Sequence, residues 1–140
     1  MENIRKTIIF PLIQISRRLH KRAVNDLNAL GLYAGQEKFL LLLWEQDGLT
    51  QSQIAEQMCV EHATVTQVLE RLERAGLIQR CRDEKDGRIS RVYLTDKGRA
   101  LQEPVQRLWS EWEAQALVGF TQEEKLLLRR FLLQMQENLD

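Results

Sequence analysis

Cysteine, proline, glycine and long apolar runs are all scarce in this sequence, and each scarcity excludes a class of protein. Two cysteines among 140 residues rule out a disulfide framework and a zinc site built on paired Cys-x-x-Cys spacing. Seven glycines and two prolines leave little room for long loops, so we expect a mostly helical chain. The longest purely apolar run covers residues 39–44, which is far too short to span a membrane.

An excess of charge of one sign is also missing. Twenty basic and twenty acidic residues cancel, although residues 1–30 carry six basic residues against two acidic ones. Without a polybasic tail, binding to nucleic acid has to be argued from motif and geometry rather than from composition. The apolar stretch 8–13 runs into Arg17 and Arg18 without a small-residue cleavage site, so we expect a cytoplasmic protein rather than a secreted one.

The composition is that of one globular domain, with 44% apolar and 29% charged residues. A chain of this length buries roughly two thirds of its unfolded surface, which is enough for a core without disulfides or metals. Apolar residues at steps of three and four predict helices along most of it. These helices cover residues 11–30, 35–46, 51–58 and about 62–75, followed by one that starts after Thr95 and a last one that starts after Thr121.

Local signals mark the ends of several of these helices. Thr50 with Gln53, and later Thr121 with Glu124, match capping boxes, in which the two residues satisfy each other's backbone N–H groups. Gly76 stands where a left-handed residue would end the fourth helix.

Both prolines are expected to interrupt helices. Pro11 either starts the first helix or kinks a longer one that includes residues 3–10. Pro104 should bend the helix that follows Thr95. The side chains that we expect to face inward on the last helix are Leu127, Leu128, Phe131, Leu132, Met135 and Leu139.

The periodicity changes in the middle of the chain. Two short runs that contain β-branched residues, Ile78–Arg82 and 89–94, flank Asp86 and Gly87, a dipeptide that strongly favours a hairpin. The two helices before them are joined by a three-residue turn. Helices with such a turn, followed directly by a two-stranded hairpin, predict a winged helix-turn-helix, a mainly α fold with a small β-hairpin wing.

The second helix of this motif provides candidate base contacts. With Val65, Val68, Leu69 and Leu72 facing the core, a rotation of about 100° per residue turns Ala63 and Gln67 outward. Gln67 can pair with adenine through two hydrogen bonds, and Ala63 can touch a thymine methyl group. The candidate DNA-binding residues on the two helices are Ser52, His62, Ala63, Thr64, Thr66, Gln67, Glu70, Arg71 and Arg74. The threonines and Arg71 suit phosphate oxygens. A solvated helix face is the alternative, which the short turn and the hairpin argue against.

The loop between the two strands provides a second group of candidates. An arginine at a hairpin tip can enter a narrow minor groove, where the potential is most negative, and Asp86 would orient Arg88 for this role. A charged turn in water is the alternative. The candidate DNA-binding residues of the wing are Arg82, Lys85, Asp86, Arg88 and Arg91.

Taken together, these motifs resemble the MarR-type transcriptional regulators. The segments that carry the resemblance are 31–36, 49–55, 63–66 and 69–78, and most specifically the wing residues 82–88 with 92–99. The resemblance covers about residues 11–139 in order. It implies an obligate homodimer in which the first and the last two helices of each chain intertwine. It also implies a palindromic operator, usually bound by a repressor that a small molecule releases.

The resemblance suggests a division of this single MarR-type domain. Residues 1–30 and 99–140 are expected to be dimerisation helices, and residues 31–98 a winged helix-turn-helix lobe that binds double-stranded DNA. The terminal helices carry long apolar stripes that the lobe cannot cover, so they need a second chain.

A small-molecule pocket between the lobe and the dimerisation helices would also fit the resemblance. Arg17, His20 and Trp44 are the candidates for binding a small anionic or aromatic ligand there. The alternatives are a solvated helix face for the first two residues and a core position for Trp44.

Two other function classes stay open. A winged-helix adaptor that binds protein instead of DNA is favoured by the weakly basic recognition helix, and Arg88 argues against it. A thiol-based redox switch could use Cys59 or Cys81, but peroxide-sensing relatives keep their reactive cysteine in the first helix, and residues 1–58 contain none. The two histidines are too isolated to form a metal site, and no catalytic motif is present, so we expect no metal, no cofactor and no enzymatic activity.

Overall fold

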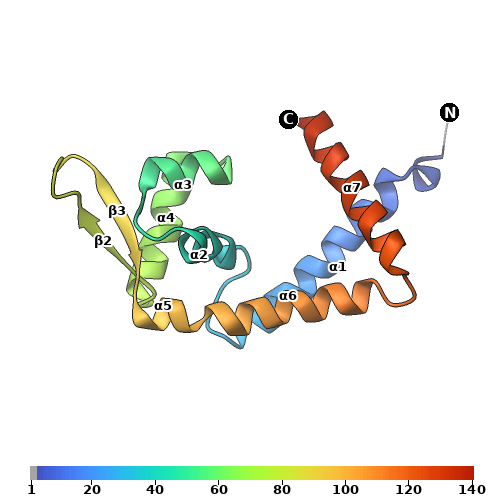
Figure 1. Ribbon diagram of the computed structural model, residues 1–140, viewed down its shortest axis with the longest axis horizontal. Helices are drawn as coiled ribbons and strands as arrows, with labels where there is room; N and C mark the ends of the chain where they lie inside the picture. Colours follow the sequence, from blue (N-terminus) through green and yellow to red (C-terminus); the bar gives the residue numbers. More distant parts are fainter. Residues whose placement is uncertain (1–2) are drawn as a thin grey trace. The chain divides into compact units, whose positions relative to one another are not determined.

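The computed structural model describes residues 3–140 (Figure 1). Its contacts divide the chain into two compact units, one up to Arg107 and the other Leu108–Asp140. The elements of the first unit are η1 (Ile4–Lys6), α1 (Ile9–Asn28), α2 (Gln36–Glu45), β1 (Leu49–Thr50), α3 (Gln51–Met58), α4 (His62–Arg74), β2 (Ile78–Arg82), β3 (Ser90–Leu94) and α5 (Asp96–Ala100). The helix α6 (Gln102–Ala116) crosses the boundary, and α7 (Gln122–Leu139) belongs to the second unit. We call the part from α2 to α5, residues 36–100, the winged lobe.

The core of the winged lobe is built from apolar side chains of its helices and its sheet. Val65, Leu69 and Leu72 of α4 are all 0% exposed, whereas Val68 is half-buried. The predicted rotation of α4 is therefore confirmed. The other side chains of the lobe with at most 2% exposure are Leu40, Leu43, Ile54, Leu77, Ile78 and Val92.

The predicted helix ends are confirmed where a local motif specified them. Thr50 Oγ1 accepts a hydrogen bond from the Gln53 N–H at 3.1 Å, and Gln53 Oε1 accepts one from the Thr50 N–H at 2.9 Å. Thr121 and Glu124 make the same reciprocal pair at the start of α7. Gly76 has a φ of +76°, the left-handed conformation expected for it after α4.

The sheet has three antiparallel strands in the order β1-β3-β2, so the predicted two-stranded hairpin was incomplete. β2 and β3 form the expected hairpin. The additional strand β1 is only two residues long, and its Leu49 and Thr50 pair with Val92 and Arg91 of β3. A strand this short has no measurable alternation of side chains, so periodicity could not reveal it.

The turn of the hairpin lies where Asp86 and Gly87 predicted it. The strands are joined by the loop 83–89, one residue longer than the segment 83–88 that separates the two predicted strands. Within this loop, the Ile89 N–H donates a hydrogen bond to the Asp86 carbonyl at 3.0 Å. Side-chain bonds made by Asp83 and Asp86 stabilise the loop.

Both prolines lie in the first turn of a helix, which corrects their predicted roles. α1 begins at Ile9, so Pro11 neither starts a helix nor kinks a longer one, and η1 is separate. The bend expected at Pro104 is a break at Leu101, between α5 and α6. Pro104 lacks the N–H that would bond to the Ala100 carbonyl four residues earlier, so a continuous helix through Leu101 would lose that bond.

Most of the apolar face of α7, which we expected to face inward, is exposed among residues 3–140 of the single chain. Leu128 and Met135 are half-buried. The others are exposed: Leu127 49%, Phe131 50%, Leu132 38% and Leu139 83%. Among residues 3–140, no helix combines the length and the apolar character needed to cross a membrane.

Candidate nucleic-acid interface

The outer face of α4 presents a row of exposed, mostly polar side chains, which we call the polar row. Seven of the predicted DNA-binding residues on this helix are exposed, namely His62, Ala63, Thr64, Gln67, Glu70, Arg71 and Arg74. Ser52, on α3, is exposed as well. Because Val65, Leu69 and Leu72 face the core, this row lies on the side of α4 that is turned away from the lobe.

Thr66 has a different role from the one predicted, because its hydroxyl is used inside the protein. It donates a hydrogen bond to the His62 carbonyl at 2.9 Å and accepts one from Gln51 Nε2 at 2.5 Å. The imidazole of His62 lies 3.4 Å from Gln51 Nε2 and 3.4 Å from Ser52 Oγ. Thr66 therefore holds α3 against α4 instead of presenting a free hydroxyl to a phosphate. No sequence motif marks Gln51, since the capping box accounts only for Gln53.

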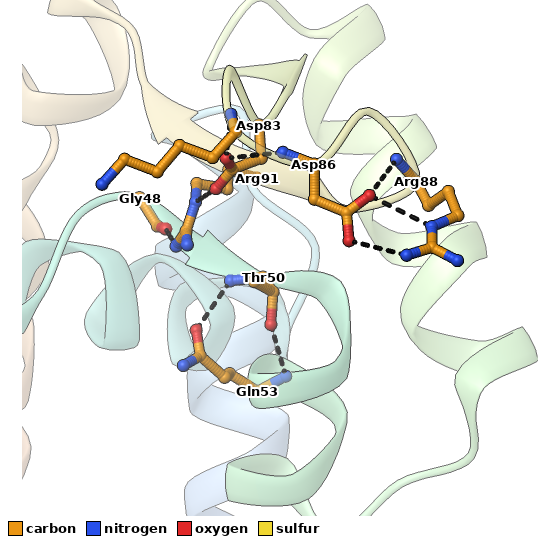
Figure 2. Close-up of polar contacts among 8 residues, drawn as sticks. Gly48, Thr50, Gln53, Asp83, Asp86, Arg88 and Arg91 are labelled. Atoms are coloured by element: carbon orange, nitrogen blue, oxygen red, sulfur yellow. Dashed lines mark hydrogen bonds and ion pairs between the residues drawn. The ribbon is translucent and has the colours of Figure 1, made fainter.

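At the wing, Asp86 orients Arg88 as predicted. Asp86 Oδ1 accepts hydrogen bonds from the Arg88 N–H at 3.0 Å and from Arg88 Nε at 3.2 Å, and Oδ2 accepts one from the second guanidinium nitrogen at 3.3 Å (Figure 2). These bonds from Arg88 lower the pKa of Asp86 below its ordinary value. The Arg88 side chain is 91% exposed, so it is held in one orientation while it projects into solvent.

Arg91, also predicted to contact DNA, is bonded within the lobe instead. Its Nε donates to Asp83 Oδ2 at 2.6 Å, and another guanidinium nitrogen donates to the Gly48 carbonyl at 3.0 Å (Figure 2). The bond with Arg91 lowers the pKa of Asp83 and raises that of Arg91 itself. Asp83 and Gly48 were absent from the predicted site, and Gly48 lies 43 residues from Arg91 in the sequence.

A further ion pair connects the hairpin to α4. Glu73, near the end of α4, accepts hydrogen bonds from both the backbone N–H and the guanidinium of Arg80 on β2, each at 3.2 Å. The side-chain bond with Arg80 is the main cause that lowers the pKa of Glu73. The wing is thus attached to the same helix that presents the polar row. The remaining predicted wing residues, Arg82 and Lys85, are exposed.

The predicted ligand residues lie on two helices, Arg17 and His20 on α1 and Trp44 on α2. Trp44 is half-buried and donates a hydrogen bond from Nε1 to the Gly98 carbonyl at 3.0 Å, so its polar atom is used in packing. Arg17 and His20 are exposed on α1. Cys59 and Cys81 are both exposed and free. Within residues 3–140, no three histidine, cysteine or acidic side chains form a group that could hold a metal ion.

Comparisons with known proteins agree with this geometry. The model of the MarR family matches residues 32–90, which include α2, α3, α4 and β2. The uncharacterized HTH-type transcriptional regulator YwoH of Bacillus subtilis (strain 168) is 32% identical over 138 residues, 96% of this chain and 100% of the relative.

Solved structures extend the similarity to the whole fold. The crystal structure of the transcriptional regulator SlyA has a TM-score of 0.86 and 30% identity, and the match covers 95% of this chain and 94% of that one. The S. aureus MepR–DNA complex has a TM-score of 0.86 and 29% identity, with 94% and 98% covered. One of these similar structures is thus a complex with DNA, and this chain belongs to the MarR family of transcriptional regulators.

Proposed function

We propose that this regulator binds a palindromic operator as a homodimer and represses transcription from it, with release by a small molecule. The observation that carries the proposal is the pairing of two exposed features on one lobe, the polar row of α4 and the oriented Arg88 of the wing. A groove-reading helix and a minor-groove arginine are the two parts that a winged helix needs for sequence-dependent binding.

In this proposal, the N-terminal half of α4 enters the major groove. Gln67 donates to and accepts from adenine, and Ala63 contacts a thymine methyl group. Glu70 can accept a hydrogen bond from the amino group of cytosine. Arg71 and Arg74 lie nearer the end of the helix and bind phosphates, which set the register rather than the sequence.

The wing and the turn provide the remaining contacts. Arg88 enters the minor groove, whose readout distinguishes A·T from G·C pairs but not their orientation. Arg82 and Lys85, both exposed beside it, bind phosphates. Ser52 and His62 lie at the junction of α3 and α4, where a polar side chain can reach the backbone of the same half-site.

The exposed apolar faces of the terminal helices, including Leu127 and Phe131 on α7, support the proposed homodimer. A soluble protein rarely leaves such a continuous apolar face in water, and a second copy carries the matching face. Two-fold symmetry then places one recognition helix in each half of a palindromic site. Residues 1–30 and 99–140 are the proposed dimerisation helices, and 31–98 the DNA-binding lobe.

Repression and release by a small molecule are the usual mode of action of this family and are proposed here on that basis. Arg17, His20 and Trp44 are the proposed contacts of an anionic or aromatic ligand. If millimolar benzoate weakens operator binding by the wild-type protein but not by Arg17→Ala, the result would support a ligand site at these residues. An affinity that benzoate leaves unchanged would oppose it.

The relatives are regulators rather than enzymes, so we propose that this protein has no catalytic activity. We also propose a cytoplasmic location, where DNA is accessible.

A selection of bound duplexes from a random pool tests the function directly. Gln67→Ala should relax the preference at one position of each half-site, at a cost of about 1–3 kcal/mol on the preferred sequence. The matched variant Arg71→Ala should weaken binding to all sequences nearly equally and reduce the salt dependence.

Two results would contradict the proposal. If Gln67→Ala selects the wild-type consensus with affinity lost evenly, Gln67 does not read a base. If the wild-type protein shows no salt-dependent binding to duplex DNA, a protein-binding adaptor becomes the better interpretation.

A further inference from the structure

The Asp86–Arg88 pair orients the Arg88 side chain but does not by itself order the loop that carries it. Arg88 projects from the loop 83–89, and a loop that is free in solution has to be ordered before it can hold an arginine in a groove. Ordering it on binding would reduce affinity, whereas a loop that is already fixed avoids that loss. The residues that fix the loop therefore contribute to binding without a contact of their own.

Asp83 is the group that orders the loop. Its Oδ1 accepts hydrogen bonds from the backbone N–H groups of Lys85 at 2.7 Å and of Asp86 at 3.3 Å. Its Oδ2 accepts the 2.6 Å bond from Arg91. Only 14% of the Asp83 side chain is exposed, so these bonds are largely shielded from water. The backbone of Asp86, whose carboxylate holds Arg88, is thereby fixed by Asp83.

Arg91 anchors Asp83 to a rigid part of the lobe. Its second bond goes to the carbonyl of Gly48, whose N–H donates to the Val92 carbonyl at 3.0 Å, so Gly48 is itself bonded to the sheet. Gly48 immediately precedes β1, which leads directly into α3. The bonds thus run from the helix-turn-helix through Gly48, Arg91 and Asp83 to the loop that carries Arg88.

We propose that Asp83 and Arg91 are positioning residues that hold Arg88 ready for the minor groove, and that neither acts on DNA by its own charge. This inference rests on the proposed contact of Arg88 with DNA. It assigns Arg91 a role different from a phosphate contact. The guanidinium fork suits the role because it reaches a carboxylate and a carbonyl at once, which a lysine ammonium on its single flexible stem does poorly.

The sign of one substitution separates positioning from simple electrostatics. Asp83 is an acid on a surface that approaches phosphates, so on charge alone Asp83→Asn should strengthen DNA binding. If Asp83 is a positioning residue, Asp83→Asn should weaken DNA binding, because the asparagine amide would turn a donor toward the donors of Arg91. Asn has nearly the shape of Asp and keeps an oxygen for the backbone N–H groups, so the fold should survive.

The experiment measures the affinity of the dimer for a duplex that the wild-type protein selects from a random pool. Asp83→Asn should bind about fivefold more weakly. The control is Glu84→Gln, which removes the neighbouring exposed acid and should bind equally well or about twofold more tightly. Arg91→Lys keeps the charge and should lose about as much affinity as Asp83→Asn. Thermal unfolding of each variant checks that the lobe is folded at the assay temperature.

Combination with Arg88→Ala tests whether the effect passes through Arg88. In that background, Asp83→Asn and Arg91→Lys should change affinity less than about twofold, because the residue they position is gone. The inference is overturned if Asp83→Asn tightens binding as Glu84→Gln does, or if the losses persist undiminished without Arg88. If Arg88→Ala alone leaves affinity unchanged, the proposed minor-groove contact fails and the inference fails with it. If Arg88→Ala weakens binding but Asp83→Asn does not, only the inference fails.

Discussion

The helices α4 and α7 carry the same kind of apolar pattern, yet their apolar side chains differ in burial. On α4, Val65, Leu69 and Leu72 are fully buried in the winged lobe. On α7, Leu127 and Phe131 at the same helical spacing are about half exposed, at 49% and 50%. The comparison shows that periodicity identifies the face of a helix that must be covered but not the chain that covers it.

The difference follows from what each region offers as a partner. The winged lobe surrounds α4 with α3 and a three-stranded sheet, which together close a core. In the unit Leu108–Asp140, Trp112 is buried beside Trp109, with ring centroids 5.7 Å apart, but no residue of α7 is buried. A unit with so few elements cannot enclose an apolar face of this length, which is why we assign its cover to a second chain.

The largest expected effect tests whether the apolar face of α7 is covered by a second chain. Leu127→Glu with Phe131→Glu places four carboxylates in the proposed two-fold interface, and burial of unpaired charge is strongly unfavourable. We expect the dimer to dissociate at least about a hundredfold more readily, or the protein to aggregate, as measured by analytical ultracentrifugation. The control Glu137→Lys changes the charge by the same amount on the opposite face of α7 and should leave the dimer intact. A double variant that remains a tight dimer would rule out this interface.

The self-contained packing of the winged lobe is tested at Gly98, on α5. A Cβ added there would lie 2.1 Å from the Leu77 carbonyl oxygen, a backbone atom that already accepts a hydrogen bond from the Thr95 N–H. Gly98→Ala should therefore destabilise the protein by roughly 2–4 kcal/mol in urea unfolding at fixed protein concentration. The control Gly87→Ala has no heavy atom within 4 Å of the added Cβ and should be within about 0.5 kcal/mol of wild type. Equal stabilities for the two variants would show that the packing at α5 is looser than described.

A substitution at the wing should change operator binding without changing the stability of the lobe. Because Arg88 is 91% exposed, Arg88→Ala should leave the unfolding midpoint and the dimer unchanged. It should weaken operator binding by about 1–3 kcal/mol and reduce the salt dependence by about one counterion. Fluorescence anisotropy at several salt concentrations measures both. An unchanged affinity and salt dependence in a folded protein would make Arg88 a turn charge only.

The smallest expected effect concerns the ion pair that joins α4 to the wing. The Arg80 side chain lowers the pKa of Glu73 below its ordinary value of 4.5, so the folded state favours the carboxylate. The resulting stabilisation is present above that value and is lost as the pH falls through the lowered pKa. Glu73→Gln should therefore cost a little stability at pH 7, and less at acid pH, in urea unfolding. In an Arg80→Gln background the pH-dependent part of this difference should disappear, and its persistence would assign the effect to another group.

Much of the fold could be predicted from sequence because the deciding interactions are local. The capping boxes at Thr50 and Thr121 join residues three apart, and the left-handed Gly76 is recognised by its place after a periodic segment. The rotation of α4 followed from the spacing of its apolar residues, and with it the exposed row that includes Gln67. The Asp86–Arg88 pair was accessible for the same reason, since its members are two residues apart.

Only the tertiary structure decided which polar residues of the site are free to meet DNA. Thr66 is bonded to Gln51, fifteen residues away, and Arg91 to Gly48, forty-three residues away, so neither contact leaves a local pattern. The same holds for β1, which exists only because β3 lies beside it. A short-range interaction depends on the chain's own spacing and can be read along the sequence. A contact across the fold depends on how separate elements pack, and packing determines whether a charged side chain binds the protein or faces its ligand.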